Sequence, residues 1–201
     1  MKRPIVIEFS GLPNSGKTTL LHNLEKICKC NNICAIIVQE PAELLPNTIQ
    51  KGSIAQNFWI TLETIQKSLE LSFISDVDFI LLDRGFYNQL FWATLYKEKD
   101  DKYASYVQNF MEEFDKMYHV KPDYLYIVDV DVEESIRRRM NTGIPVTFSK
   151  KDFLLQYRSD IEKFAQKINH KFYIDTTNFS KDEVAEIVFN TIIKILDIAK
   201  S

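Results

Sequence analysis

The strongest limit on the fold of this chain comes from eight residues near its start. Residues 11–18 read GLPNSGKT, which fits the pattern G-x4-G-K-[ST] at every position. The apolar run at 5–9 predicts a strand before this loop, and residues 17–29 predict a helix after it. Glycines in such a loop let backbone N–H groups turn inward around a phosphate, and the helix start adds a positive dipole. The segment therefore predicts a strand–loop–helix unit that binds phosphate.

Individual positions of the loop have separate expected tasks. Lys17 can reach the β- and γ-phosphates of a nucleotide, and the Thr18 hydroxyl can hold Mg²⁺. An incidental glycine-rich turn is the alternative, but two of only 5 glycines in 201 residues fall in this loop. We therefore expect ATP, or a close relative of it, together with Mg²⁺. The expected nucleotide contacts in this loop are Gly11, Asn14, Ser15, Gly16, Lys17, Thr18 and Thr19.

Beyond the loop, short apolar runs alternate with longer amphipathic stretches. This alternation is typical of βαβ units and of a parallel sheet. The predicted strands are 5–9, 33–38, 79–82, 124–130 and 172–174. The predicted helices are 17–29, 54–74, 86–118 with a break near 100–101, 132–140, 151–169 and 181–199. Together they predict one α/β domain over residues 1–201, with helices on both faces of a five-stranded sheet.

Composition narrows the function classes. A formal net charge of −3 provides no basic footprint for nucleic acid, and no stretch approaches the ~20 apolar residues of a membrane span. The three cysteines, Cys28, Cys30 and Cys34, could form a metal half-site with His22, but their spacing is not one that zinc sites use. Reduced thiols are the favoured interpretation, and they indicate a cytoplasmic protein.

Charged residues follow two of the predicted strands at their carboxyl ends, where open α/β sheets bind ligands. Asp83 ends the third strand, at the position of an acid that binds Mg²⁺ through water, and Arg84 follows it. An arginine there can neutralise charge on a transferred phosphoryl group, although an ordinary ion pair in a surface turn is the alternative. Glu40, after the second strand, could accept a proton from an attacking hydroxyl or fix it by a hydrogen bond. Its alternative is a solvated turn glutamate before Pro41.

With these motifs placed, the chain resembles the P-loop nucleoside and nucleotide kinases, most of all thymidylate kinases and deoxynucleoside kinases. The resemblance rests on the loop at 11–18, Glu40-Pro41, Asp83-Arg84, Lys121-Pro122-Asp123, the arginine run at 137–139, and Asp175-Thr176-Thr177. It implies the three-layer P-loop NTPase fold, an Mg²⁺–ATP donor and a lid at about 137–149. In the lid, Arg138 would pack on the adenine and Arg139 would contact phosphate. Lys17, Glu40, Arg84 and Arg139 would then be the catalytic residues.

The chain matches each of the two subfamilies only in part. Thymidylate kinases place an arginine on the helix after the second strand, but residues 52–75 contain no arginine and only one lysine, Lys67. Deoxynucleoside kinases use an amide beside aromatic residues on that helix, and Asn57 and Trp59 resemble this arrangement. Trp59 could equally be core packing at helical spacing. The expected acceptor-binding residues are Glu40, Asn57, Trp59 and Arg84.

The leading hypothesis is therefore a kinase that transfers the γ-phosphoryl group of ATP to a nucleoside or a nucleoside monophosphate. One alternative is a kinase of a non-nucleotide metabolite on the same scaffold. The other is a nucleotide-binding regulatory module with little catalysis. The chain has no Asn-Lys-x-Asp guanine reader, which excludes a GTPase of that type. The expected partner is a small-molecule acceptor, without nucleic acid or membrane, and the resemblance also implies homodimers.

Overall fold

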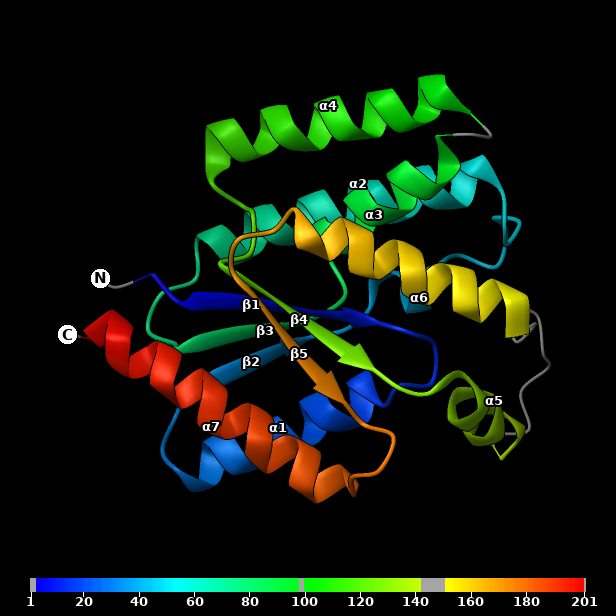
Figure 1. The fold of residues 1–201 in the computed structure, drawn as a ribbon. Coiled ribbons are helices and arrows are strands. Elements are labelled where there is room, and N and C mark those ends of the chain that lie inside the picture. Colours follow the sequence, from blue (N-terminus) through cyan, green and yellow to red (C-terminus); the bar gives the residue numbers. More distant parts are fainter. Residues whose placement is uncertain (1–2, 98–99, 142–150, 201) are drawn as a thin grey trace.

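A five-stranded parallel sheet forms the centre of the protein (Figure 1). The computed structural model describes residues 3–97, 100–141 and 151–200. The strand order is β2-β3-β1-β4-β5, and every neighbouring pair is parallel. The five strands are β1 (Ile5–Gly11), β2 (Ala35–Val38), β3 (Phe79–Asp83), β4 (Tyr124–Asp129) and β5 (Lys171–Asp175). The parallel α/β sheet expected from the sequence is thus confirmed.

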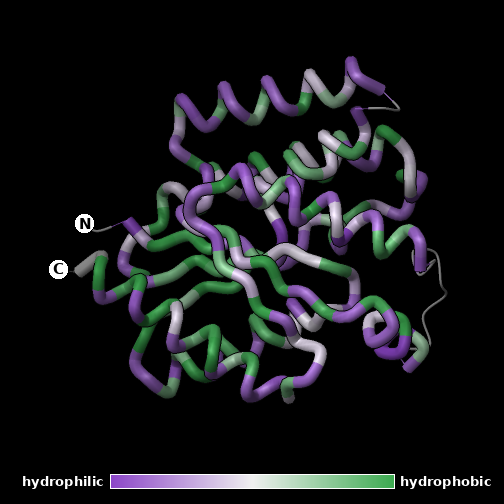
Figure 2. The backbone as a smooth tube through the Cα atoms, viewed as in Figure 1, coloured by the Kyte–Doolittle hydropathy of each residue, from purple (hydrophilic) through white to green (hydrophobic). Residues whose placement is uncertain are grey.

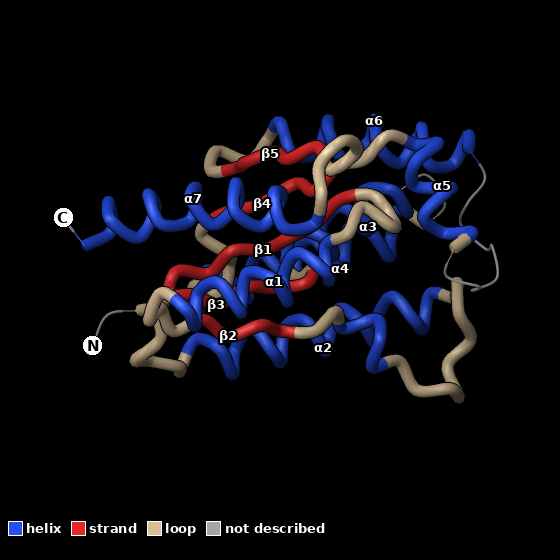
Figure 3. The backbone as a smooth tube through the Cα atoms, turned by 90° about the horizontal axis from the view of Figure 1, so that it is seen from below, coloured by secondary structure: helices blue, strands red, loops and turns tan. Residues whose placement is uncertain are grey.

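Helices cover both faces of this sheet. On one face α1 (Lys17–Cys30) packs against α7 (Lys181–Lys200), and seen from below the two helices cross in front of the strands (Figure 3). The other face carries α2 (Ile54–Ser72), α3 (Phe86–Tyr96) and α6 (Lys151–Gln166). An outer helix, α4 (Asp101–Tyr118), rests on α2 and α3, and α5 (Val132–Met140) lies beyond the carboxyl ends of the strands.

Side-chain alternation along β1 divides the interior between these two faces. Ile7 and Phe9 are fully buried in the cluster that β1 shares with α1 and α7. Glu8, between them, points to the opposite face, toward α3. The strands appear largely hydrophobic in Figure 2, as expected for a sheet that is covered on both sides. Glu8 therefore places a carboxyl group in the apolar layer between the sheet and α3.

Three segments can be compared with the element boundaries that the sequence predicted. The predicted helix at 86–118 is two helices, and the Asp100 side chain caps the second one by accepting from the Tyr103 N–H at 2.9 Å. This confirms the predicted break. A short 3₁₀ helix, η1 (Pro41–Leu44), follows Glu40 and was not predicted. Of the predicted lid at 137–149, residues 137–140 lie in α5, and residues 142–149 fall outside the described part of the chain.

The described residues include no helix of the length and apolar character that a membrane crossing requires. In the same residues, no three His, Cys, Asp or Glu side chains gather in a way that could hold a metal ion. Cys28 is a buried thiol, while Cys30 and Cys34 are exposed thiols. The half-site considered for these cysteines and His22 therefore does not form among the described residues.

Candidate functional site

The carboxyl ends of β1, β2 and β3 bring the candidate residues to one edge of the sheet. β1 lies at the centre and pairs with β3 on one side and β4 on the other, so the loop after β1 opens at the point where the strand order reverses. Register pairing sets Phe9 of β1 beside Asp83 of β3. The phosphate-binding loop, Asp83, Arg84 and Glu40 consequently face one another, as the sequence predicted.

Backbone geometry explains the glycines of the loop. Gly11 has φ 141° and Gly16 has φ 90°, which are angles that side chains rarely adopt. At Gly11 there is also no room, because an added Cβ would lie 2.0 Å from the Val128 carbonyl oxygen of β4. The loop can therefore leave β1 only through a residue without a side chain.

Gly11→Ala is expected to destabilise the fold by at least about 3 kcal/mol, since both the dihedral angle and the Val128 carbonyl oppose the new methyl group. Gly52→Ala is the matched control. Gly52 also has positive φ, 81°, but nothing lies within 4 Å of its added Cβ, so that variant should lose only about 1 kcal/mol. Urea denaturation of both variants measures the difference, and equal losses would contradict the steric explanation.

Lys17 is held inside the loop. Its Nζ donates to the Leu12 carbonyl oxygen at 2.7 Å, and to the Gly11 carbonyl and the Ser15 hydroxyl at 3.3 Å each. Burial, and to a lesser extent the nearby charge of Arg84, lowers the pKa of Lys17 to about 7. An anion in the loop would compensate for the missing hydration of this ammonium group, which is the environment that a phosphate contact requires.

Thr18 and Asp83 form a pair suited to a hard cation. The Thr18 hydroxyl donates to Asp83 Oδ2 at 2.5 Å. The second carboxylate oxygen, Oδ1, is buried and has no hydrogen-bond partner. Carboxylate and hydroxyl oxygens beside phosphates are the ligands that Mg²⁺ uses in such sites. The residues present therefore fit a magnesium ion.

Arg84 and Glu40 form an ion pair between the loop and an adjoining cavity. Arg84 Nη1 lies 3.0 Å from Glu40 Oε1, and both side chains are less than one-fifth exposed. Arg84 adopts φ 59°, a left-handed conformation, and its N–H donates to the Phe9 carbonyl at 3.0 Å. Its Nε is buried without a hydrogen-bond partner. The guanidinium group thus retains an unused donor inside the site.

An aromatic cavity of about 290 Å³ opens beside this ion pair. We use this name for the space bounded by the Glu40–Arg84 pair, the amides of Asn57 and Gln89, and Arg139. The Nδ2 of Asn57 is buried and has no hydrogen-bond partner, so it is available to a ligand. The aromatic side chains that line the cavity are Trp92, Tyr96, Phe153 and Tyr157.

Trp59 does not line this cavity, which corrects its assignment as an acceptor-binding residue. Residues two apart on a helix point about 200° away from each other, so Asn57 and Trp59 cannot face the same ligand. Phe86 does not line the cavity either, because it is buried in the core between α3 and α4. The indole at the cavity belongs to Trp92 of α3.

The three arginines of α5 separate into three environments. Arg138 bridges the phosphate-binding loop and the turn after β5: Nη1 donates to the Asn14 carbonyl at 3.5 Å and to the Thr176 hydroxyl at 2.9 Å, and Nη2 donates to the Thr176 carbonyl at 2.7 Å. Arg139 lines the aromatic cavity. Arg137 has a largely exposed side chain that pairs with Glu134. This arrangement agrees with the register in which Arg138 serves the nucleotide and Arg139 the phosphate, and it leaves Arg137 at the surface.

Sequence reasoning missed several residues of the cavity wall. Asn88 and Gln89 lie in the first turn of α3, directly after Asp83-Arg84, and Phe153 and Tyr157 are four residues apart on α6. The position of Asn88 and Gln89 after a strand's carboxyl end was a usable signal. For Phe153 and Tyr157, helical spacing predicts a shared face but not the surface that this face meets.

Glu8 is a buried carboxyl group close to the site. Burial raises its pKa to about 7, although hydrogen bonds from the α3 backbone and the charge of Arg84 act in the opposite direction. The unfolded chain, with a pKa near 4.5, loses this proton earlier than the folded chain as the pH rises. Glu8 therefore lowers stability progressively between pH 4.5 and about 7.

Glu8→Gln should remove this pH dependence. Relative to the variant, the wild-type free energy of unfolding is expected to fall by about 3 kcal/mol between pH 4.5 and 7, since each pH unit of pKa shift corresponds to about 1.4 kcal/mol. Urea denaturation of both proteins across this range measures the difference. Parallel curves of stability against pH would contradict the assignment to Glu8.

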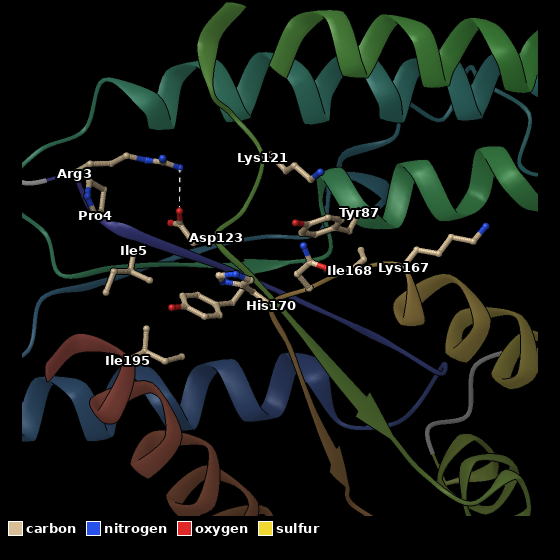
Figure 4. Close-up of a pocket in the computed structure, with 12 residues that line it drawn as sticks. Arg3, Pro4, Ile5, Tyr87, Lys121, Asp123, Lys167, Ile168, His170 and Ile195 are labelled. Atoms are coloured by element: carbon tan, nitrogen blue, oxygen red, sulfur yellow. Dashed lines mark ion pairs between the residues drawn. The ribbon is translucent and has the colours of Figure 1, made fainter. Parts of the chain in front are cut away.

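A second cavity, of about 520 Å³, lies at the opposite end of the sheet (Figure 4). Arg3 reaches across it to Asp123 at 3.5 Å, and Lys121, Lys167 and His170 also line it. Lys167 follows the C-terminus of α6, where a cation is stabilised by the helix dipole. The strands begin at this end of the sheet, whereas the phosphate-binding loop lies at the opposite end, where the strands finish. Arg3 and Lys167 therefore have structural explanations in this cavity.

Comparisons with known proteins extend over nearly the whole chain. The chain is 27% identical to a protein named "Probable thymidylate kinase" from Methanocaldococcus jannaschii, covering 89% of this chain and 90% of that protein. It is 26% identical to "Thymidylate kinase" from Ehrlichia canis, covering 90% and 91%, and 25% identical to "Thymidylate kinase" from Ehrlichia chaffeensis, covering 91% and 93%. No family model matches the chain.

Proposed function

We propose that this chain, a P-loop kinase similar to thymidylate kinases over about 90% of its length, transfers the γ-phosphoryl group of ATP to a nucleoside monophosphate, with dTMP as the first candidate acceptor. The observation that carries the proposal is the convergence at one sheet edge. Lys17, the Thr18–Asp83 pair and the Glu40–Arg84 pair meet there beside the aromatic cavity.

On the donor side, the loop would hold the phosphates of ATP through its backbone N–H groups, and Lys17 would contact the β- and γ-phosphates. Thr18 and Asp83 would hold Mg²⁺, which would neutralise part of the phosphate charge. Arg138 would lie at the adenine, since it bridges the loop and the turn after β5. These groups bind and orient ATP without forming a covalent bond to it.

At the border with the aromatic cavity, Arg84 would stabilise the charge of the group in transfer. The oxygen of an acceptor phosphate is already ionised, so Glu40 need not take a proton from it. Glu40 would instead hold the guanidinium group of Arg84 in place, as the 3.0 Å ion pair does now. Arg139 would contact the acceptor phosphate.

The acceptor side of the site differs from that of the thymidylate kinases that this chain resembles, because α2 contains no arginine. Among the described residues, the cations that line the aromatic cavity are Arg84 and Arg139, and we assign the acceptor phosphate to them. A nucleoside acceptor is the second candidate. It is favoured by the unpartnered Asn57 amide beside aromatic side chains, which suits a base. For a nucleoside, Glu40 would accept the hydroxyl proton.

The test is a coupled ADP-release assay with Mg²⁺–ATP against the common nucleoside monophosphates and the corresponding nucleosides. We expect turnover of dTMP with kcat/KM at least 100-fold above that of thymidine. Turnover of nucleosides alone would favour the second candidate. No turnover with any member of the panel would contradict both and favour a non-nucleotide acceptor. ATP hydrolysis that ignores the acceptor would favour a regulatory module.

Trp92→Ala is expected to raise KM for the accepted nucleotide at least 10-fold, because the cavity loses an aromatic wall against which a base can stack. KM for ATP should change less than about 2-fold. Trp59→Ala is the matched control, since it removes an indole of the same size that does not line the cavity. Steady-state kinetics with each substrate varied separates the two variants, and equal effects of both would contradict the assignment of the cavity.

A further inference from the structure

The Glu8 carboxylate is bonded to the start of α3. Oε2 accepts the Tyr87 N–H at 2.8 Å, and Oε1 accepts the Asn88 N–H at 2.7 Å. The side chain is fully buried and forms no ion pair with any described residue. A buried carboxylate is costly unless it is satisfied in this way. Its partners are backbone N–H groups of a helix 79 and 80 residues away in the sequence.

Helix α3 lacks any other cap. Its N-cap residue is Gly85, which has no side chain to accept a hydrogen bond, and its first turn contains no acidic residue. The first N–H groups of a helix have no partner within the helix, and the helix dipole favours a negative charge beside them. Glu8 provides both the acceptor and the charge from the adjacent strand.

Gly85 supplies independent support for this contact. Its φ of 171° is extended backbone that any residue adopts, so conformation does not require a glycine here. Space is tight, however, because an added Cβ would lie 3.1 Å from Glu8 Oε2 and 3.2 Å from Leu82 Cδ1, so these side chains would have to give by a few tenths of an ångström. The glycine after Asp83-Arg84 therefore gives the carboxylate room to reach the helix.

The helix start that Glu8 holds carries both sides of the proposed transfer site. Asp83 and Arg84 directly precede it, and Asn88 in its first turn lines the aromatic cavity. Arg84 is in a left-handed conformation, which costs of order 1–3 kcal/mol and requires support from its surroundings. The fixed N-terminus of α3 holds the chain that follows Arg84. The hydrogen bond from the Arg84 N–H to the Phe9 carbonyl holds Arg84 itself against β1.

We propose that Glu8 is a positioning residue for phosphoryl transfer: by capping α3 it fixes Arg84 in the orientation that meets the transferred group. The proposal rests on the proposed function in one respect, namely that Arg84 acts in transfer. ATP binding should not depend on Glu8, because the hydrogen bonds that hold Lys17 inside the phosphate-binding loop involve no residue of α3.

The kinetic test compares wild type and Glu8→Gln at pH 8 with Mg²⁺–ATP and dTMP. We expect kcat to fall at least 10-fold, while the Kd of Mg²⁺–ATP changes less than 2-fold. The double variant Glu8→Gln/Arg84→Ala should be no slower than Arg84→Ala alone, because the cap acts through Arg84. Gly85→Ala, which pushes on the carboxylate, should lower kcat in the same direction. If Glu8→Gln does not fold, the effect of Gly85→Ala on kcat tests the proposal instead.

A second readout does not depend on the acceptor. Hydrogen exchange of the Tyr87 and Asn88 amides should be at least 10-fold faster in Glu8→Gln, whereas the Leu20 and Leu21 amides in α1 should be unchanged. Unchanged exchange at Tyr87 and Asn88, wild-type kcat, or a parallel loss of ATP affinity would each overturn the proposal. If Arg84→Ala proves fully active, the role of Arg84 in the proposed function fails, and the exchange experiment still decides whether Glu8 caps α3.

Discussion

Lys17→Ala is expected to lower kcat for phosphoryl transfer at least about 10³-fold and to leave the protein folded. The ammonium group lies inside the loop, and transfer would lose the cation that contacts the β- and γ-phosphates. The fold does not require it, because burial lowers the pKa of Lys17 to about 7. Burial thus disfavours the charged side chain, so its removal should change stability by no more than about 1 kcal/mol.

The measurement combines single-turnover transfer from Mg²⁺–ATP to the accepted nucleotide with urea denaturation of the same preparation. Lys26→Ala is the matched control, since it removes an exposed lysine from the same helix. We expect that control to keep wild-type rates. Full activity of Lys17→Ala would overturn the assignment of the loop as the donor site, and loss of activity together with loss of the fold would leave no separate role for the ammonium group in transfer.

Arg84→Ala is expected to lower kcat about 10³-fold or more, with Mg²⁺–ATP affinity changed much less. An arginine that stabilises charge on a transferred phosphoryl group contributes about 10³ to 10⁵ in rate. Arg84→Lys should restore little of this, because an ammonium group keeps the charge but loses the planar donor array. The variant also leaves Glu40 without its ion-pair partner, at a cost of about 3 kcal/mol because both side chains are less than one-fifth exposed.

Titration calorimetry with Mg²⁺–ATP and single-turnover transfer separate binding from chemistry in this variant. Arg137→Ala is the control, because that side chain is largely exposed and does not line the aromatic cavity. It should leave both quantities unchanged. A variant at Arg84 that transfers at the wild-type rate would refute the role given to the Glu40–Arg84 pair.

Local motifs accounted for much of the site. The loop at 11–18 encodes its own backbone shape, through glycines at positive φ and a helix that begins at Lys17. Strand ends then placed Asp83, Arg84 and Glu40 by the general rule that parallel strands present their carboxyl ends at one edge. The prediction of a five-stranded parallel sheet succeeded for a similar reason, because buried parallel strands appear as unbroken apolar runs between amphipathic helices.

Tertiary structure alone decided which side chains meet across the fold. The choice between Trp59 and Trp92, the separate environments of Arg137, Arg138 and Arg139, and the contact of Glu8 with α3 depend on how helices rest on the sheet. The Glu8 contact joins residues about 80 positions apart, and it exists because β1 and β3 are neighbours in the strand order. Periodicity specifies the face on which a side chain lies. It does not specify the surface that this face meets, since that depends on the strand order and on the packing of the whole chain.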